Sequence, residues 1–326
     1  MSLRKLLVLS GLVLPLLASP VQALQVVASV KPLQLLSAAL LDGISEPRLL
    51  VPTDASVHNY VLKPSDVRGL AAADLVIWVG PELELFLGKV LKNTDARILQ
   101  LSHAGTAASD SESDHDHDHD HEKHADEHDD EHEGHADESA DHAAESEQGE
   151  VHNHAVDAHL WMDPELMLAA AQRLQQMLAQ IAPEHGPRLA ANYARFAASL
   201  QARDAALRLQ LAPLADRGFF VFHDAYGHFV GHYGLKQLGY FTVDPARPPG
   251  ARRLSDIRRQ LKAREAVCVF SEPQFRANVV SSVTQGLNVR HGELDPLARG
   301  FEPGPTAYVD YLESLAGAFA DCLTPD

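Results

Sequence analysis

The sequence predicts an α/β protein of two lobes, each a parallel sheet flanked by helices, joined by one long rigid helix. Three observations predict this fold. Short apolar, β-branched runs alternate with helical patterns over residues 24–102, and the alternation restarts at residue 219. Between them, residues 187–214 are rich in Ala, Leu and Arg and read as one helix. Strands that alternate with helices imply parallel sheets covered on both faces.

The N-terminal lobe is predicted over residues 24–182. Its strands are expected at 24–30, 47–52, 74–80 and 96–102, and its helices at 32–43, 65–73 and 82–93. A further strong helix is expected at 164–183, with Asp163 as its N-cap and Pro164 at its first position.

The linking helix is predicted over residues 183–212, and the C-terminal lobe over 213–326. A helix of about 25 residues is roughly 38 Å long, enough to bridge two lobes. The second lobe is expected to contain strands at 219–225, 237–243, 266–273 and 288–296 and helices at 226–234, 253–265, 275–287 and 306–323.

The N-terminus predicts export. Arg4 and Lys5 precede a short apolar run, and Val21-Gln22-Ala23 is a small-residue pattern that a signal peptidase cuts after Ala23. The apolar run is too short for a membrane span and contains Pro15, which disfavours a permanent anchor. Residues 1–23 are therefore predicted to be a signal peptide, and the mature protein to be periplasmic.

One insert carries the charge excess. The net charge is -18, and residues 110–150 hold 19 acidic residues and one lysine, so the remaining chain is balanced. Without a basic stripe, nucleic-acid binding is excluded. Periodicity is absent over residues 104–156, which predicts a disordered loop. Weak, exchangeable metal binding is expected from its alternating histidines: His115, His117, His119, His121, His124, His128, His132 and His135.

Two cysteines, Cys268 and Cys322, lie in the last quarter of the chain. Export permits a disulfide, and two cysteines in one exported domain favour pairing over metal binding. Two separate buried thiols are the alternative.

Four residues form a candidate metal site. His58 follows the strand at 47–52, His159 precedes a helix, His223 ends a strand and Asp295 ends another. Singly, a loop histidine is more often a surface or core group, and an Asp before Pro is a common turn starter. As a set, two from each lobe lie at strand edges that face one cleft, where ligands bind in parallel α/β sheets.

The composition of this set favours Zn²⁺. Three neutral imidazoles and one carboxylate make a borderline-soft, four-position site, whereas manganese prefers more oxygen ligands. Among the other candidates, His228 and His232 are expected to be ordinary helix residues, with the cleft lining or a minor metal site as alternatives. Glu272 is expected either to accept a hydrogen bond from a donor outside the ligand set or to support a strand end.

Several stretches resemble the cluster A-I family, the metal-binding proteins of bacterial ABC importers, and within it the periplasmic zinc-uptake members. They are DASVHNYVLKPSD, DAHLWMDP, FHDAYGHF, FTVDPARPPGARRLSDIR, CVFSEPQF and LDPL, which together span nearly the whole mature chain.

The resemblance implies that His58, His159 and His223 bind zinc and that Cys268 and Cys322 form a disulfide. Some zinc members have Glu directly before the first ligand histidine, but this chain has Val57 there. The fourth ligand is therefore Asp295, a water or a group from the insert. The implied function is zinc capture without catalysis, by a monomer that delivers Zn²⁺ to a membrane permease.

Two other functions remain open at the level of sequence. A zinc-dependent exported hydrolase could use three histidines and a free fourth position to activate water. A periplasmic metal store or adhesin would use the insert as its main metal binder.

Overall fold

The computed structural model describes residues 23–102, 157–243, 249–263, 266–274 and 278–325. All the described residues belong to one compact unit. The predicted His-rich insert, with its auxiliary histidines, and residues 1–22 of the predicted signal peptide lie outside the described residues. The proposed lobe boundaries at residues 182 and 212 stay predictions.

The first sheet is four-stranded and parallel, in the order β2-β1-β3-β4. Its strands are β1 (Val26–Ala28), β2 (Arg48–Leu49), β3 (Leu75–Trp78) and β4 (Arg97–Gln100). The two central strands, β1 and β3, are buried along their whole length, as expected for strands covered on both faces.

The second sheet repeats this arrangement in the order β6-β5-β7-β8, again all parallel. Its strands are β5 (Phe219–His223), β6 (Gln237–Thr242), β7 (Cys268–Ser271) and β8 (Arg290–Glu293). Together the two sheets confirm the predicted fold class. Because all strands of a sheet run the same way, their carboxyl ends meet at one edge, where the candidate residues lie.

Helices flank both sheets. They are α1 (Lys31–Leu40), α2 (Pro64–Ala71), α3 (Gly88–Leu91), α4 (Pro164–Ile181), α5 (Gly186–Leu211), α6 (Gly227–Tyr233), α7 (Ala251–Lys262), α8 (Asn278–Thr284) and α9 (Ala307–Leu323). Asp163 caps α4 as predicted, since its Oδ1 accepts from the backbone N–H groups of Glu165 and Leu166. Within the described part of the chain, no helix has the length and apolar character needed to cross a membrane.

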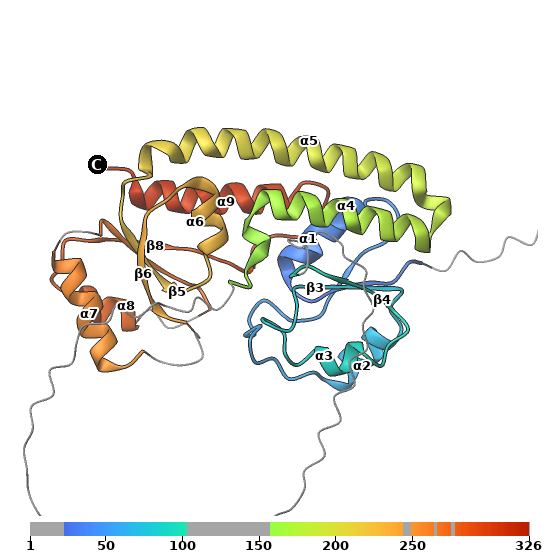
Figure 1. Ribbon diagram of the computed structural model, residues 1–326, viewed down its shortest axis with the longest axis horizontal. Coiled ribbons are helices and arrows are strands. Elements are labelled where there is room, and N and C mark those ends of the chain that lie inside the picture. Colours follow the sequence, from blue (N-terminus) through green and yellow to red (C-terminus); the bar gives the residue numbers. More distant parts are fainter. Residues whose placement is uncertain (1–22, 103–156, 244–248, 264–265, 275–277, 326) are drawn as a thin grey trace, which may run out of the picture. The chain divides into compact units, whose positions relative to one another are not determined.

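The long helix is not the sole connection between the two sheets. It packs along α4 and α9, and α9 also packs against α1 from the N-terminal part of the chain (Figure 1). A continuous apolar core therefore includes residues from both sheets. Within it the Trp161 Nε1–H donates to the carbonyl of Pro296 at 2.7 Å, and the Tyr308 hydroxyl donates to the carbonyl of Trp161 at 2.9 Å. These bonds fix the turn that follows His159 to the C-terminal part of the fold.

The helix predicted at 82–93 is much shorter than expected. Only α3 (Gly88–Leu91) is helical, and the preceding residues form turns. The reason is Glu84, whose Oε2 accepts from the backbone N–H groups of Val79 at 2.8 Å and Gly80 at 3.2 Å. This local bond between side chain and backbone competes with a continuous helix.

The predicted disulfide is confirmed. Cys268, the first residue of β7, is bonded to Cys322 near the end of α9, and their Cα atoms lie 6.0 Å apart. The bond joins a strand of the second sheet to the helix that spans both sheets.

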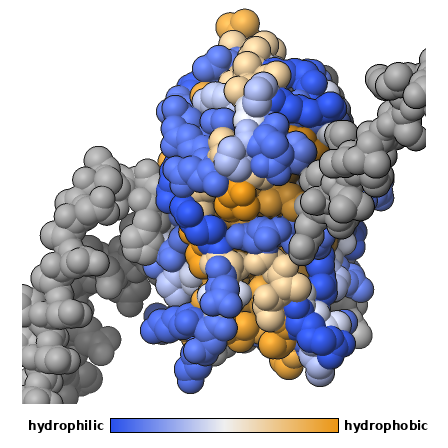
Figure 2. Space-filling model, turned by 90° about the vertical axis from the view of Figure 1, so that its right-hand side faces the viewer, coloured by the Kyte–Doolittle hydropathy of each residue, from blue (hydrophilic) through white to orange (hydrophobic). Residues whose placement is uncertain are grey.

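An apolar groove of about 1030 Å³ opens beside the first sheet, lined among others by Trp78, Phe86 and Ile98. On the end of the unit that carries β4, hydrophobic surface lies between hydrophilic patches (Figure 2). His58 lines this groove and also the cavity described next. The loop that carries His58 therefore lies between the apolar groove and the small cavity.

Candidate metal centre

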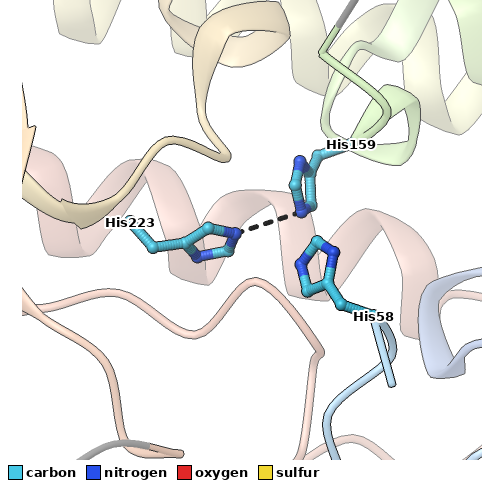
Figure 3. A group of neighbouring side chains, drawn as sticks. All are labelled: His58, His159 and His223. Atoms are coloured by element: carbon cyan, nitrogen blue, oxygen red, sulfur yellow. Dashed lines mark hydrogen bonds between the residues drawn. The ribbon is translucent and has the colours of Figure 1, made fainter. Parts of the chain in front are cut away.

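Three histidines from separate parts of the chain meet in one place. His58 lies in the loop between β2 and α2, His159 directly precedes a short 3-10 turn (Leu160–Met162), and His223 is the last residue of β5. One ring nitrogen from each lies within 4.8 Å of the others. Their rings point toward one another (Figure 3). Among the described His, Cys, Asp and Glu residues, this is the one such group of three or more.

The spacing of two of these nitrogens suits tetrahedral zinc. The Nε2 atoms of His159 and His223 lie 3.2 Å apart. Two nitrogens bonded to Zn²⁺ at about 2.05 Å with tetrahedral angles are about 3.3 Å apart. A metal ion can therefore bind both nitrogens with almost no movement of either ring. The ring centroid of His58 lies 5.5 Å from that of His159 and 5.6 Å from that of His223, so this loop residue completes a three-nitrogen face.

Carboxylates hold the outer side of both rings. The Nδ1 of His159 lies 2.7 Å from Asp157 Oδ1, and the Nδ1 of His223 lies 3.0 Å from Glu272 Oε1. With Nδ1 protonated, each ring donates to its carboxylate and presents the Nε2 lone pair to the centre. Such carboxylate–histidine pairs orient metal ligands and raise their basicity.

Sequence reasoning left the role of Glu272 open and did not single out Asp157. The signal for Asp157 is its place two residues before His159, which lets one carboxylate oxygen accept from both the backbone and the ring of that histidine, at 2.9 and 2.7 Å. Glu272 directly follows β7 and meets His223 only through the pairing of β5 with β7. Its role therefore depends on the tertiary structure.

Two of the three histidines are buried. His159 is 5% exposed and His223 3%. Burial lowers the pKa of His159, and its hydrogen bond to Asp157 only partly opposes this. Burial alone would raise the pKa of Asp157, but the hydrogen bonds and charge of His159 outweigh it and hold this pKa below its usual value. The result is a neutral imidazole beside an ionised carboxylate, the pair that a divalent cation prefers.

The cavity at the centre is small. Its volume is about 50 Å³, and Val57, Pro296 and Leu297 line it together with the three histidines. This space holds an ion and a few atoms around it, and it excludes an organic ligand of ordinary size. Apolar walls also keep competing water away from the nitrogens.

Asp295 lies outside the group of three histidines. Its Oδ1 accepts from Gln274 Nε2 at 2.7 Å and from the backbone N–H of Leu297 at 3.1 Å. Its Oδ2 accepts from the backbone N–H of Arg299 at 2.7 Å. In this arrangement the carboxylate organises the turn after β8, and its role as fourth ligand stays a prediction.

The two helix histidines have different surroundings. His228 Nε2 lies 2.8 Å from the carbonyl oxygen of Asp157, so it touches a residue that supports the centre. His232 Nε2 lies 2.7 Å from Asp204 Oδ1 on α5 and takes no part in the group of three.

Known proteins are similar to this chain in sequence and in fold. Residues 26–322 match the family ZnuA, described as zinc-uptake complex component A, periplasmic. The high-affinity zinc uptake system protein ZnuA of Yersinia pestis is 39% identical over 314 residues, which cover 94% of each chain. A crystal structure of ZnuA has a TM-score of 0.71 at 21% identity, covering 93% of this chain and 100% of that one. A zinc-bound ZnuA deletion mutant has a TM-score of 0.70 at 21% identity, covering 94% of this chain and 100% of that one.

Two parallel α/β sheets, with three histidines near their strand ends that could hold a metal ion, match the class of metal-binding solute-binding proteins. The chain belongs to the ZnuA family of periplasmic zinc-uptake proteins, which confirms the resemblance seen in its sequence. Members of this family are solute-binding proteins and not enzymes, as predicted.

Proposed function

We propose that this chain captures Zn²⁺ in the periplasm, after cleavage behind Ala23, and delivers it as a monomer to the membrane permease of an ABC importer. The observation that carries the proposal is the convergence of His58, His159 and His223, two of them oriented by carboxylates on their outer nitrogens. Family membership and the printed names of the relatives support both zinc and import.

The donor set favours zinc over manganese. The three imidazole nitrogens are the candidate ligands, and imidazole suits zinc, whereas carboxylate and water oxygens suit manganese. We propose that the fourth position is completed by Asp295, a water or a group from the insert. For Asp295 to bind the metal, at least one of its present hydrogen bonds must be given up.

The arrangement of acidic groups also supports binding over hydrolysis. A zinc hydrolase needs a carboxylate or histidine near the metal-bound water as general base. Asp157 and Glu272 are instead held on the outer nitrogens of two proposed ligands. If the zinc-loaded protein hydrolysed a substrate and His223→Ala removed that activity, the result would favour the zinc-dependent hydrolase.

Metal analysis and calorimetry test the proposal. The purified protein is expected to hold one tightly bound zinc ion and a weaker set. His58→Ala and His223→Ala should each lower zinc affinity more than about 100-fold, beyond the 10–100-fold effect of an outer-shell partner. His185→Ala is the matched control, since His185 lies in the turn before α5, away from the group. Tight binding that survives His223→Ala would contradict the assignment, and many equal weak sites would favour a metal store.

A further inference from the structure

His228 is linked to the metal centre without being part of it. It lies in the first turn of α6, and its Nε2 lies 2.8 Å from the carbonyl oxygen of Asp157. A carbonyl oxygen only accepts hydrogen bonds, so this nitrogen must carry a proton and donate. A protonated nitrogen has no lone pair for a metal. His228 therefore acts on the centre through Asp157.

Asp157 passes this contact on to a proposed ligand. Its Oδ1 accepts from both the backbone N–H and the ring Nδ1 of His159. One carboxylate oxygen thus fixes the position of the ligand's backbone and the rotation of its ring. A shift of Asp157 moves both.

The carboxylate of Asp157 is also seated against α6. A Cβ atom placed on Gly227 would lie 2.8 Å from Asp157 Oδ2. Only glycine leaves room for this approach, since real Cβ atoms are not found so close. Gly227 thus leaves room for the carboxylate of Asp157, and His228 bonds its backbone carbonyl.

This contact gives two ligands a common support. His223 ends β5, and His228 follows five residues later on the helix next in the chain. His159 comes from a distant part of the sequence, directly after residues 105–156. Because Asp157 rests on α6, the positions of the Nε2 atoms of His159 and His223, which lie 3.2 Å apart, depend on the same helix. Preorganisation of this kind raises affinity, since less ordering is left to occur on binding.

We infer that His228 is a positioning residue of the zinc centre, which anchors Asp157 and through it orients His159. The inference rests on the proposed function, because it assumes that His159 binds zinc. The role is narrow: His228 supplies one N–H donor to one carbonyl oxygen, assisted by the small Gly227.

The test compares His228→Ala with His228→Gln in the full chain, with His185→Ala as control. Zinc affinity is measured by competition with a chromogenic chelator, and the ligand set by the absorption spectrum of the Co²⁺-loaded protein. His228→Ala should lower zinc affinity about tenfold or more, within the usual range for outer-shell partners. His228→Gln keeps an N–H donor and should restore most of the affinity. Neither variant should change the Co²⁺ bands, because the ligands remain the same.

Two results would overturn the inference. One is wild-type affinity in a folded His228→Ala. The other is a His228→Gln variant as weak as His228→Ala with altered Co²⁺ bands, which would make His228 itself a ligand. Gly227→Ala supplies a second route if His228→Ala does not fold: it displaces Asp157 while keeping His228, and unchanged affinity there would also contradict the inference. Failure of the wild type to bind zinc would instead refute the proposed function.

Discussion

The carboxylates of Asp157 and Glu272 decide which nitrogen of His159 and His223 faces the centre of the three-histidine group. Without them, either ring nitrogen of a neutral histidine could carry the proton. With Nδ1 held by a carboxylate, both Nε2 lone pairs point to one place, where they lie 3.2 Å apart. Under the proposed function, the orientation of two zinc ligands therefore depends on carboxylates that do not contact the metal.

Asp295→Asn separates the two roles open to this residue. Its oxygens serve Gln274 and the turn after β8, and an asparagine keeps one acceptor for them. We expect zinc affinity to fall by less than about tenfold, below the typical outer-shell effect. Calorimetry at pH 7.5 checks this. A loss as large as that of His223→Ala would make Asp295 the fourth ligand.

Glu84 gives stability a pH dependence that does not involve the metal. Burial raises its pKa from 4.5 to about 7, against the opposing hydrogen bonds from Ser29, Gly80 and Val79. The folded state thus binds more protons than the unfolded state between these values, and stability is lost as pH rises from 4.5 to about 7. This shift corresponds to about 3 kcal/mol as an upper limit.

Glu84→Gln should remove this loss. The amide oxygen can still accept from Val79 and Gly80, but it carries no charge at any pH. We expect the variant to match the wild type near pH 4.5 and to be more stable at pH 8, in urea unfolding of zinc-free protein. Glu82→Gln is the control, since Glu82 is exposed two residues away. An equal gain at both pH values would refute the explanation.

At the scale of elements, α5 is held to the N-terminal part of the fold by a buried side chain. Asn192 is 3% exposed, and its Nδ2 donates to the carbonyl oxygens of Leu40 at 2.8 Å and Asp42 at 3.0 Å. These carbonyls lie at the end of α1, where helical partners are missing. One amide thus joins the long helix to the helix beneath it.

Asn192→Ala should lower the free energy of unfolding by about 1–3 kcal/mol, because the buried carbonyl of Leu40 loses its side-chain donor, whereas that of Asp42 keeps the Nε–H of Arg188. Urea unfolding measures this. Arg203→Ala is the comparison, since it breaks the exposed ion pair of α5 with Glu313 and should change stability by less than about 1 kcal/mol. Equal effects of the two substitutions would contradict the role given to Asn192.

At the scale of the whole molecule, the centre lies in the first compact unit of the chain, to which all the described residues belong. All the groups that support the three histidines belong to the first unit. The charge excess belongs to the other segment, since residues 110–150 carry 19 acidic residues and one lysine. Under the proposed function, tight zinc binding and the excess negative charge therefore belong to two different parts of the chain.

Deleting residues 110–150 should leave one tight zinc ion per chain and remove the weaker set. The melting temperature of the zinc-free protein should change by less than about 2 °C, which corresponds to under ~1 kcal/mol for a protein of this size. Elemental analysis and calorimetry measure both outcomes. Loss of the tight ion would mean that the segment supplies a ligand to the centre.

The sequence by itself determined the fold class, the pairing of Cys268 with Cys322 and the family. Periodicity and buried apolar runs are local signals, so they were sufficient to predict both parallel sheets. They failed at residues 82–93, where the Glu84 side chain bonds back to the backbone, because helical periodicity does not report such a contact.

Only the tertiary structure decided how the candidate residues are grouped. His58, His159 and His223 are separated by long stretches of sequence, and the packing of elements from both sheets around one core brings them together. The same packing places Glu272 within hydrogen-bond distance of His223, and His228 within that distance of Asp157. It also places the Asp295 carboxylate where it accepts from the backbone of the turn after β8. The physical reason is that a ligand set depends on distances and directions between side chains, and these are fixed by packing between elements far apart in the chain.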